Sequence, residues 1–147
     1  MTEVPSDILN KMERFCAWQE RCENDVRRKL TSFRLSDSQE EAIVAHLREN
    51  QFLDEERYVE MFVRGKVHAG WGKQKIVAAL RAKHIPAELV SRFGASIPEE
   101  DYEEKLRGAI EKWRRTHPDE APNSPKLVRH LLTKGYGMEE VLRAVSS

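Results

Sequence analysis

The 147-residue sequence has few of the features that mark membrane or secreted proteins. It contains only two cysteines, Cys16 and Cys22, which is too few for a disulfide framework and indicates reduced, structural thiols. No apolar run approaches the roughly 20 residues that a membrane-spanning helix needs. The N-terminus also lacks the order of a signal peptide, in which basic residues precede an apolar run. We therefore expect a cytoplasmic protein without a membrane segment.

Glycine, proline and β-branched residues are also sparse, and this argues against an extensive β-sheet. Only seven glycines and six prolines interrupt the chain, in which 34% of residues are charged and 39% are hydrophobic. Apolar residues recur at spacings of three and four, as in Tyr102, Leu106, Ile110 and Trp113. The sequence therefore predicts an all-α fold.

No arrangement of catalytic or metal-binding side chains is recognisable in the sequence. The five histidines do not fall at metal-ligand spacings with cysteines or acids, and there is no glycine-rich phosphate-binding loop. Serines gather at predicted helix starts, where they cap backbone N–H groups. The acidic run at residues 54–56 also suits a helix start, because the helix dipole favours negative charge there. We expect a protein that is not an enzyme and that binds no metal or cofactor.

What the chain does contain is an uneven distribution of charge. It has 25 basic and 25 acidic residues, so its formal net charge is zero. Residues 61–87 nevertheless contain no acidic residue, and they carry the bases Arg64, Lys66, Lys73, Lys75, Arg81 and Lys83. A run of one charge is often only a solvated face. Its concentration in the middle of a neutral chain favours binding of an acidic or polyanionic partner.

The basic block belongs to residues 52–85, which predict two helices joined by a Gly-Trp-Gly corner. Asp54 is the expected N-cap of the first helix. Gly70 and Gly72 are expected to supply the unusual backbone angles of a sharp corner. Trp71 between them is either an exposed contact or a core residue. Burial is favoured, because a large apolar ring gains free energy when it leaves water.

Local patterns predict further helix starts and buried faces. The helix at residues 6–19 is expected to begin at Ser6 or Asp7, and Ser38 with Glu41 fits a capping box. Ser124 is an expected N-cap that is followed by Pro125. Apolar stripes at helical spacing predict buried side chains that include Trp18, Tyr58, Val59, Met61, Phe62 and Trp113.

Three parts of the chain look like repeats of one unit. Apolar residues match at offsets of 50 and 51 residues, in the sets Val26, Ile76, Leu127; Leu30, Leu80, Leu131; and Leu35, Ile85, Tyr136. We therefore expect three tandem three-helix modules, at residues 1–51, 52–96 and 97–147. Since repeats contact only their neighbours, the expected outline is elongated and curved.

The central stretch resembles the RecX family of recombinase regulators. The resemblance rests on Phe52-Leu53-Asp54-Glu55-Glu56-Arg57-Tyr58, on Phe62-Val63-Arg64, and on Gly70-Trp71-Gly72, Ile76, Leu80 and Ile85. One departure is His84, where the family often has glycine. The resemblance covers residues from about 6 to the end, and it implies three tandem three-helix modules.

The same resemblance implies a non-enzymatic regulator that binds the RecA recombinase in the helical groove of the RecA–DNA filament. It would inhibit RecA and so modulate recombinational DNA repair and the SOS response. The implied partner is the RecA filament, with the DNA backbone within it as a further contact, and the chain is expected to be a monomer. The expected partner-binding residues are Arg64, Lys66, Trp71, Lys73, Lys75, Arg81 and Lys83.

Two alternatives remain open at this point. Short helices joined by tight corners also describe a direct DNA-binding, helix-turn-helix-like repeat protein. A net charge of zero argues against strong independent affinity for DNA. The other alternative is a scaffold that binds some other protein.

Overall fold

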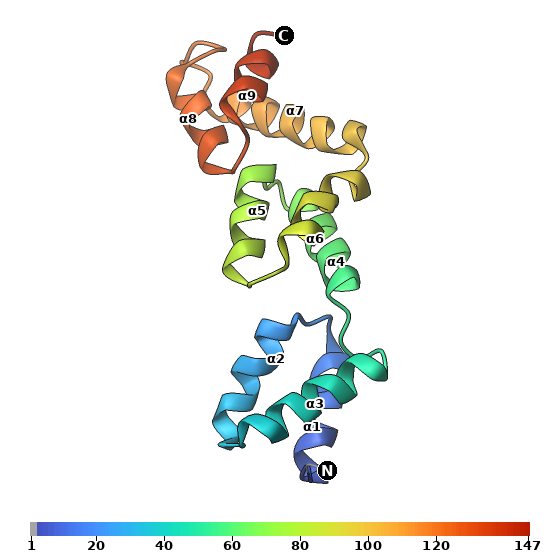
Figure 1. Ribbon diagram of the computed structural model, residues 1–147. Coiled ribbons are helices and arrows are strands. Elements are labelled where there is room, and N and C mark those ends of the chain that lie inside the picture. Colours follow the sequence, from blue (N-terminus) through green and yellow to red (C-terminus); the bar gives the residue numbers. More distant parts are fainter. Residues whose placement is uncertain (1–2) are drawn as a thin grey trace.

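The computed structural model describes residues 3–147, apart from the side chains at residues 95 and 96. Within that range every regular element is helical, and nine α-helices form three successive groups of three (Figure 1). The groups are stacked so that the two termini lie at opposite ends of an elongated molecule. The predicted all-helical fold of three-helix modules is confirmed. The elements are α1 (Ser6–Trp18), α2 (Glu23–Leu30), η1 (Thr31–Phe33), α3 (Asp37–Glu49), α4 (Glu55–His68), α5 (Lys73–Ala82), α6 (Ala87–Arg92), η2 (Phe93–Ser96), α7 (Glu99–Thr116), α8 (Pro125–Thr133) and α9 (Met138–Val145).

We call α1–α3, α4–α6 and α7–α9 the first, second and third modules. Two of their helices start where capping chemistry predicts. Asp54 caps α4, because its carboxylate accepts a hydrogen bond of 3.0 Å from the backbone N–H of Arg57. Ser124 caps α8, and its hydroxyl accepts a hydrogen bond of 3.1 Å from the backbone N–H of Lys126.

Two other predicted caps are wrong. Helix α3 is capped by Ser36 with Gln39 as its capping-box partner, two residues before the predicted pair of Ser38 and Glu41. The side-chain amide oxygen of Gln39 accepts a hydrogen bond from the backbone N–H of the N-cap, as a glutamate carboxylate would. Ser36 and Gln39 therefore form a capping box as effectively as a serine and a glutamate. Helix α1 has Pro5 at its N-cap, and neither of the two polar residues that follow caps it.

A left-handed backbone position recurs at the same place in every module. The residue before the closing hydrophobe has a φ of 53° at Arg34, 58° at His84 and 102° at Gly135. These positions are 50 and 51 residues apart, as the matched apolar residues are. In the second and third modules the next residue, Ile85 or Tyr136, donates its N–H over 3.2 Å to the carbonyl five residues earlier. His84 therefore adopts the left-handed angle that glycine tolerates best.

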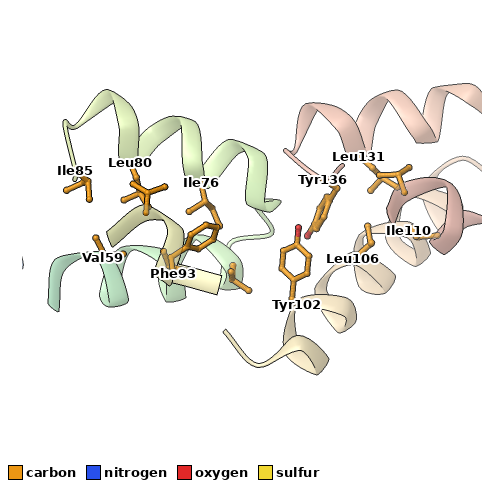
Figure 2. Packing of buried hydrophobic residues seen from close by; sticks show 14 of the residues in the cluster. Val59, Ile76, Leu80, Ile85, Phe93, Tyr102, Leu106, Ile110, Leu131 and Tyr136 are labelled. Carbon is orange, nitrogen blue, oxygen red and sulfur yellow. The ribbon is translucent and has the colours of Figure 1, made fainter. Parts of the chain in front are cut away.

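The buried apolar side chains form two separate cores. The first module has its own core, which includes Met12, Leu30 and Ile43. The second and third modules share a continuous core that extends from α4 to α9. Figure 2 shows Tyr102 and Tyr136 where these two modules meet, and their ring centroids are 5.6 Å apart. The second and third modules thus pack as one unit.

Trp18 and Met61, which the apolar stripes predict to be buried, lie on the surface, as does Leu142 of α9. Trp18 is 81% exposed at the last position of α1, and Met61 is 54% exposed on α4. The inner face of α4 follows a spacing of four residues through Val59, Val63 and Val67. This stripe turns Met61 toward solvent, because positions two residues apart lie on different sides of a helix.

Both cysteines are buried and free of disulfides. Burial raises the pKa of the Cys16 thiol and of the Cys22 thiol to about 11. Each thiol is therefore protonated at neutral pH, which agrees with the structural role expected from the sequence.

Ion pairs join the first module to the second. Lys83 Nζ lies 2.7 Å from Asp25 Oδ1, and Arg57 Nε lies 2.6 Å from Glu20 Oε1. Burial tends to raise the pKa of Asp25, but hydrogen bonds from Lys83 and from the backbone N–H of Cys22 lower it overall. Asp25 is thus ionised at neutral pH and holds Lys83 at the module junction.

The second and third modules make a close backbone crossing at Gly72. Backbone hydrogen bonds of 2.8 and 3.0 Å join the start of α5 to the turn after α8. A Cβ on Gly72 would lie 2.2 Å from backbone atoms of Gly135 and Tyr136. Gly72 has an ordinary φ of −81°, so the predicted need for an unusual angle is wrong there and confirmed at Gly70, where φ is 90°. Gly72 is required because only glycine fits the crossing.

Candidate partner-binding surface

Trp71 is at the centre of the basic region predicted from the sequence. Its half-buried ring meets the ring of Phe62 edge-on, with centroids 6.5 Å apart. The Nζ atoms of Lys66 and Lys75 lie 4.5 and 4.2 Å from the centroid of the Trp71 ring. Cation–π attraction favours both positions. Trp71 therefore packs against the core and also supports two cationic side chains at the surface.

The turn between α4 and α5 fixes this arrangement. Trp71 donates its backbone N–H to the Lys66 carbonyl at 2.9 Å. At the start of α5, Lys73 donates its backbone N–H to Tyr102 Oη at 2.9 Å, and its Nζ lies 4.6 Å from the Tyr102 ring centroid. The Tyr102 hydroxyl in turn donates to Glu140 Oε1 at 3.0 Å. We call Lys66, Trp71, Lys73 and Lys75 the Trp71 corner.

Three predicted binding residues lie outside the Trp71 corner. Lys83 is engaged within the molecule by its ion pair with Asp25. Arg81 is exposed near the end of α5 and lines a small hollow with Ile85. Arg64 is exposed on α4 and lines another hollow of about 1150 Å³ between α4 and α7, where several acidic side chains also lie.

A groove between the first and second modules is lined by several cationic and aromatic side chains that are absent from the binding residues predicted from the sequence. Its volume is about 680 Å³, and we call it the inter-module groove. The missed residues are cationic or aromatic members of the first 60 residues, where acids outnumber bases although Arg27-Arg28-Lys29 form a short basic run. Only the stacking of two modules brings them to the start of the basic region. The lining residues are Phe15, Gln19, Glu20, Arg21, Asp25, Arg28, Lys29, Tyr58, Met61, Phe62, Lys66 and Lys83.

The Trp71 corner carries groups that can bind an acidic or polyanionic partner. Within residues 3–147, no three or more His, Cys, Asp or Glu side chains are placed to hold a metal ion. In the same part of the chain no helix is long and apolar enough to cross a bilayer. The Trp71 corner instead offers ammonium groups beside an aromatic ring. Such groups form charge-assisted hydrogen bonds with carboxylates or phosphates.

Comparison with known proteins gives the same family along most of the chain. The family model for the second three-helix domain of RecX matches residues 54–92, which contain α4, α5 and α6. The chain is 29% identical over 147 residues to Regulatory protein RecX from Cronobacter sakazakii, and this covers 92% of the chain and 88% of that protein. It is 26% identical to Regulatory protein RecX from Salmonella paratyphi A, with coverage of 91% and 87%.

Two solved structures share the fold. A crystal structure of regulatory protein RecX matches with a TM-score of 0.83 and 21% identity, covering 97% of this chain and 71% of that one. The crystal structure of RecX from Lactobacillus salivarius matches with a TM-score of 0.82 and 20% identity, covering 96% of both chains. The domain match at its centre, the relatives named RecX along most of its length and the shared fold all make the chain similar to the RecX family of regulatory proteins.

Proposed function

We propose that this chain binds the RecA recombinase filament and inhibits RecA activity, thereby modulating recombinational DNA repair and the SOS response. The relatives are named regulatory proteins, and the implied target of such a regulator is RecA. The observation that carries the proposal is the Trp71 corner, because it lies inside the domain that matches the family model. In this proposal the chain acts in the cytoplasm as a monomer, without catalysis and without a cofactor.

The shape of the molecule supports binding along a filament. The three modules are stacked end to end, so their surfaces can follow a helical groove and reach more than one subunit (Figure 1). The second and third modules share one core, which makes them a preformed unit with the Trp71 corner at its junction. A preformed surface loses little conformational entropy when it binds.

Direct binding to DNA is the alternative, and the charges favour the filament. Of the six bases in residues 61–87, Lys83 is already paired with Asp25. Lys66, Lys73 and Lys75 lie over aromatic rings, which limits how far each can extend toward a phosphate backbone. Within residues 61–87 this leaves Arg64 and Arg81 for phosphate contacts, and the affinity of non-specific DNA binding depends on the number of such contacts. DNA within the filament is a further contact in the proposal, not the main partner.

We expect the chain to inhibit RecA-promoted strand exchange when it is added to preassembled filaments. The physical reason is that a rod bound in the filament groove occupies the path of the incoming duplex. The measurement is the yield of joint molecules against the concentration of the chain. Normal strand exchange in the presence of excess chain would rule out this function.

A further inference from the structure

The inter-module groove has an excess of cationic groups that make no ion pair. Each of its two carboxylates forms an ion pair, Glu20 with Arg57 and Asp25 with Lys83, while Glu20 Oε2 is buried without a hydrogen-bond partner. Arg28 and Lys29 are exposed on α2, and neither forms an ion pair with any carboxylate in residues 3–147. Arg21 and Lys66 also line the groove, and neither forms an ion pair with a carboxylate of the described chain. The groove therefore presents a positive charge that nothing in the molecule neutralises.

The same groove also exposes apolar surface. Met61 lines it and is 54% exposed, and Phe15 and Phe62 are half-buried along its sides. Trp18 is 81% exposed near the groove, and the guanidinium carbon of Arg21 lies 5.9 Å from its ring centroid. Apolar side chains that gather within a cationic rim are typical of a surface that binds a partner.

The aromatic rings of the groove are arranged for a peptide rather than for nucleic-acid bases. The guanidinium carbon of Arg21 lies 3.8 Å from the centroid of Phe15, and Lys66 Nζ lies 5.4 Å from that of Phe62. Bases bind single-strand-binding proteins by stacking on free ring faces, and here a cation lies over one face of each of these two rings. Met61 is flexible and polarisable, so it can adapt to an apolar side chain of a partner.

We propose that the inter-module groove binds an acidic protein segment that carries a large apolar side chain. The apolar side chain packs on Met61, while neighbouring carboxylates pair with Arg28, Lys29 and Arg21. Apolar anchors and opposite charges together are a common basis of peptide recognition. This inference goes beyond the proposed function, because it concerns a groove that shares only Lys66 with the Trp71 corner and makes no assumption about RecA.

A labelled peptide tests the proposal directly. The probe is a short fluorescein-labelled peptide in which glutamates surround one phenylalanine and one leucine. A control peptide has alanine at both of these apolar positions. We expect the apolar-containing peptide to bind more tightly in an anisotropy titration. Reversal of charge in Arg28→Glu with Lys29→Glu should weaken that binding about tenfold or more, since each 1.4 kcal/mol of lost attraction is a factor of ten.

Two further variants separate a specific site from general charge attraction. Arg115→Glu with Arg129→Glu makes the same change of charge at exposed arginines of the third module, and it should leave peptide binding unchanged. Met61→Ala should weaken binding of the apolar-containing peptide and not of the alanine peptide. Met61 is largely exposed, so this variant should fold normally, and circular dichroism checks that.

Several results would overturn the proposal. One is failure of the wild-type chain to bind the acidic peptide, and another is an equal loss of binding in the control variant. A labelled oligothymidylate that binds in place of the peptide, and loses affinity in the Arg28 and Lys29 variant, would assign the groove to nucleic acid. A dimer in sedimentation velocity that Met61→Ala dissociates would assign it to a second copy of the chain. None of these results bears on strand exchange, so the groove and the RecA proposal fail independently.

Discussion

Replacing Gly72 with alanine should lower the free energy of unfolding by about 3 kcal/mol, the upper end of what overpacking usually costs. The new Cβ would lie 2.2 Å from backbone atoms of Gly135 and Tyr136, and backbone cannot move aside as a flexible side chain can. Either the hydrogen bonds between the second and third modules stretch, or the shared core opens. Thermal unfolding followed by circular dichroism should show a midpoint lower by roughly 10 °C.

Gly65 provides the matched control for this substitution. It lies within α4, and a Cβ at this position would meet nothing within 4 Å. Gly65→Ala should therefore stabilise the protein by about 0.5–1 kcal/mol, because glycine is a poor residue in the middle of a helix. Wild-type stability in Gly72→Ala would contradict the close crossing of the two modules.

Charge reversal in Lys73→Glu with Lys75→Glu should weaken inhibition of RecA strand exchange at least about tenfold, because like charges that face each other across an interface cost several kcal/mol. Both residues lie in the first turn of α5, where the helix dipole favours an acidic residue. The variant should therefore fold as the wild type does. The measurement is the concentration of chain that halves the yield of joint molecules.

The choice of these two lysines follows from the structure. Reversing Lys83 as well would place a glutamate against Asp25 and disturb the junction of the first and second modules, so a loss of activity would have two explanations. The control is again Arg115→Glu with Arg129→Glu, which should inhibit as well as the wild type. Full inhibition by the variant with Lys73→Glu and Lys75→Glu would show that the Trp71 corner is not part of the binding interface.

Features that depend on neighbouring residues could be predicted from the sequence. Asp54 caps α4 because an aspartate at a helix start satisfies a backbone N–H of its own first turn. The matched positions of Leu30, Leu80 and Leu131 are all buried, since each module must cover its helices in the same way. The spacing of these leucines predicts the period of the repeat, and the left-handed turns at Arg34, His84 and Gly135 follow the same period.

Features that depend on how modules stack could not be predicted. Lys83 belongs to the basic run, yet it pairs with Asp25, which is 58 residues away in the sequence. Arg28 and Lys29 approach Lys66 only because the first module lies against the second. The pair Tyr58 and Met61 and the pair Val59 and Val63 fit helical spacing equally well. Only the neighbouring helices determine that Val63 is buried and Met61 is exposed. Charge along the sequence therefore predicts a candidate region, while tertiary contacts determine which of its cations are already paired within the molecule.

We propose that this chain recognises the RecA–DNA filament rather than DNA alone. The most direct test measures its binding to RecA filaments assembled on single-stranded DNA, and to the same DNA without RecA, over a range of salt concentrations. We predict clear binding to the filament that Lys73→Glu with Lys75→Glu reduces, and weak binding to bare DNA throughout. Equal binding to bare DNA, with log affinity falling against log salt at a slope of roughly −3 to −5, would contradict the account, because such a slope reports several direct phosphate contacts.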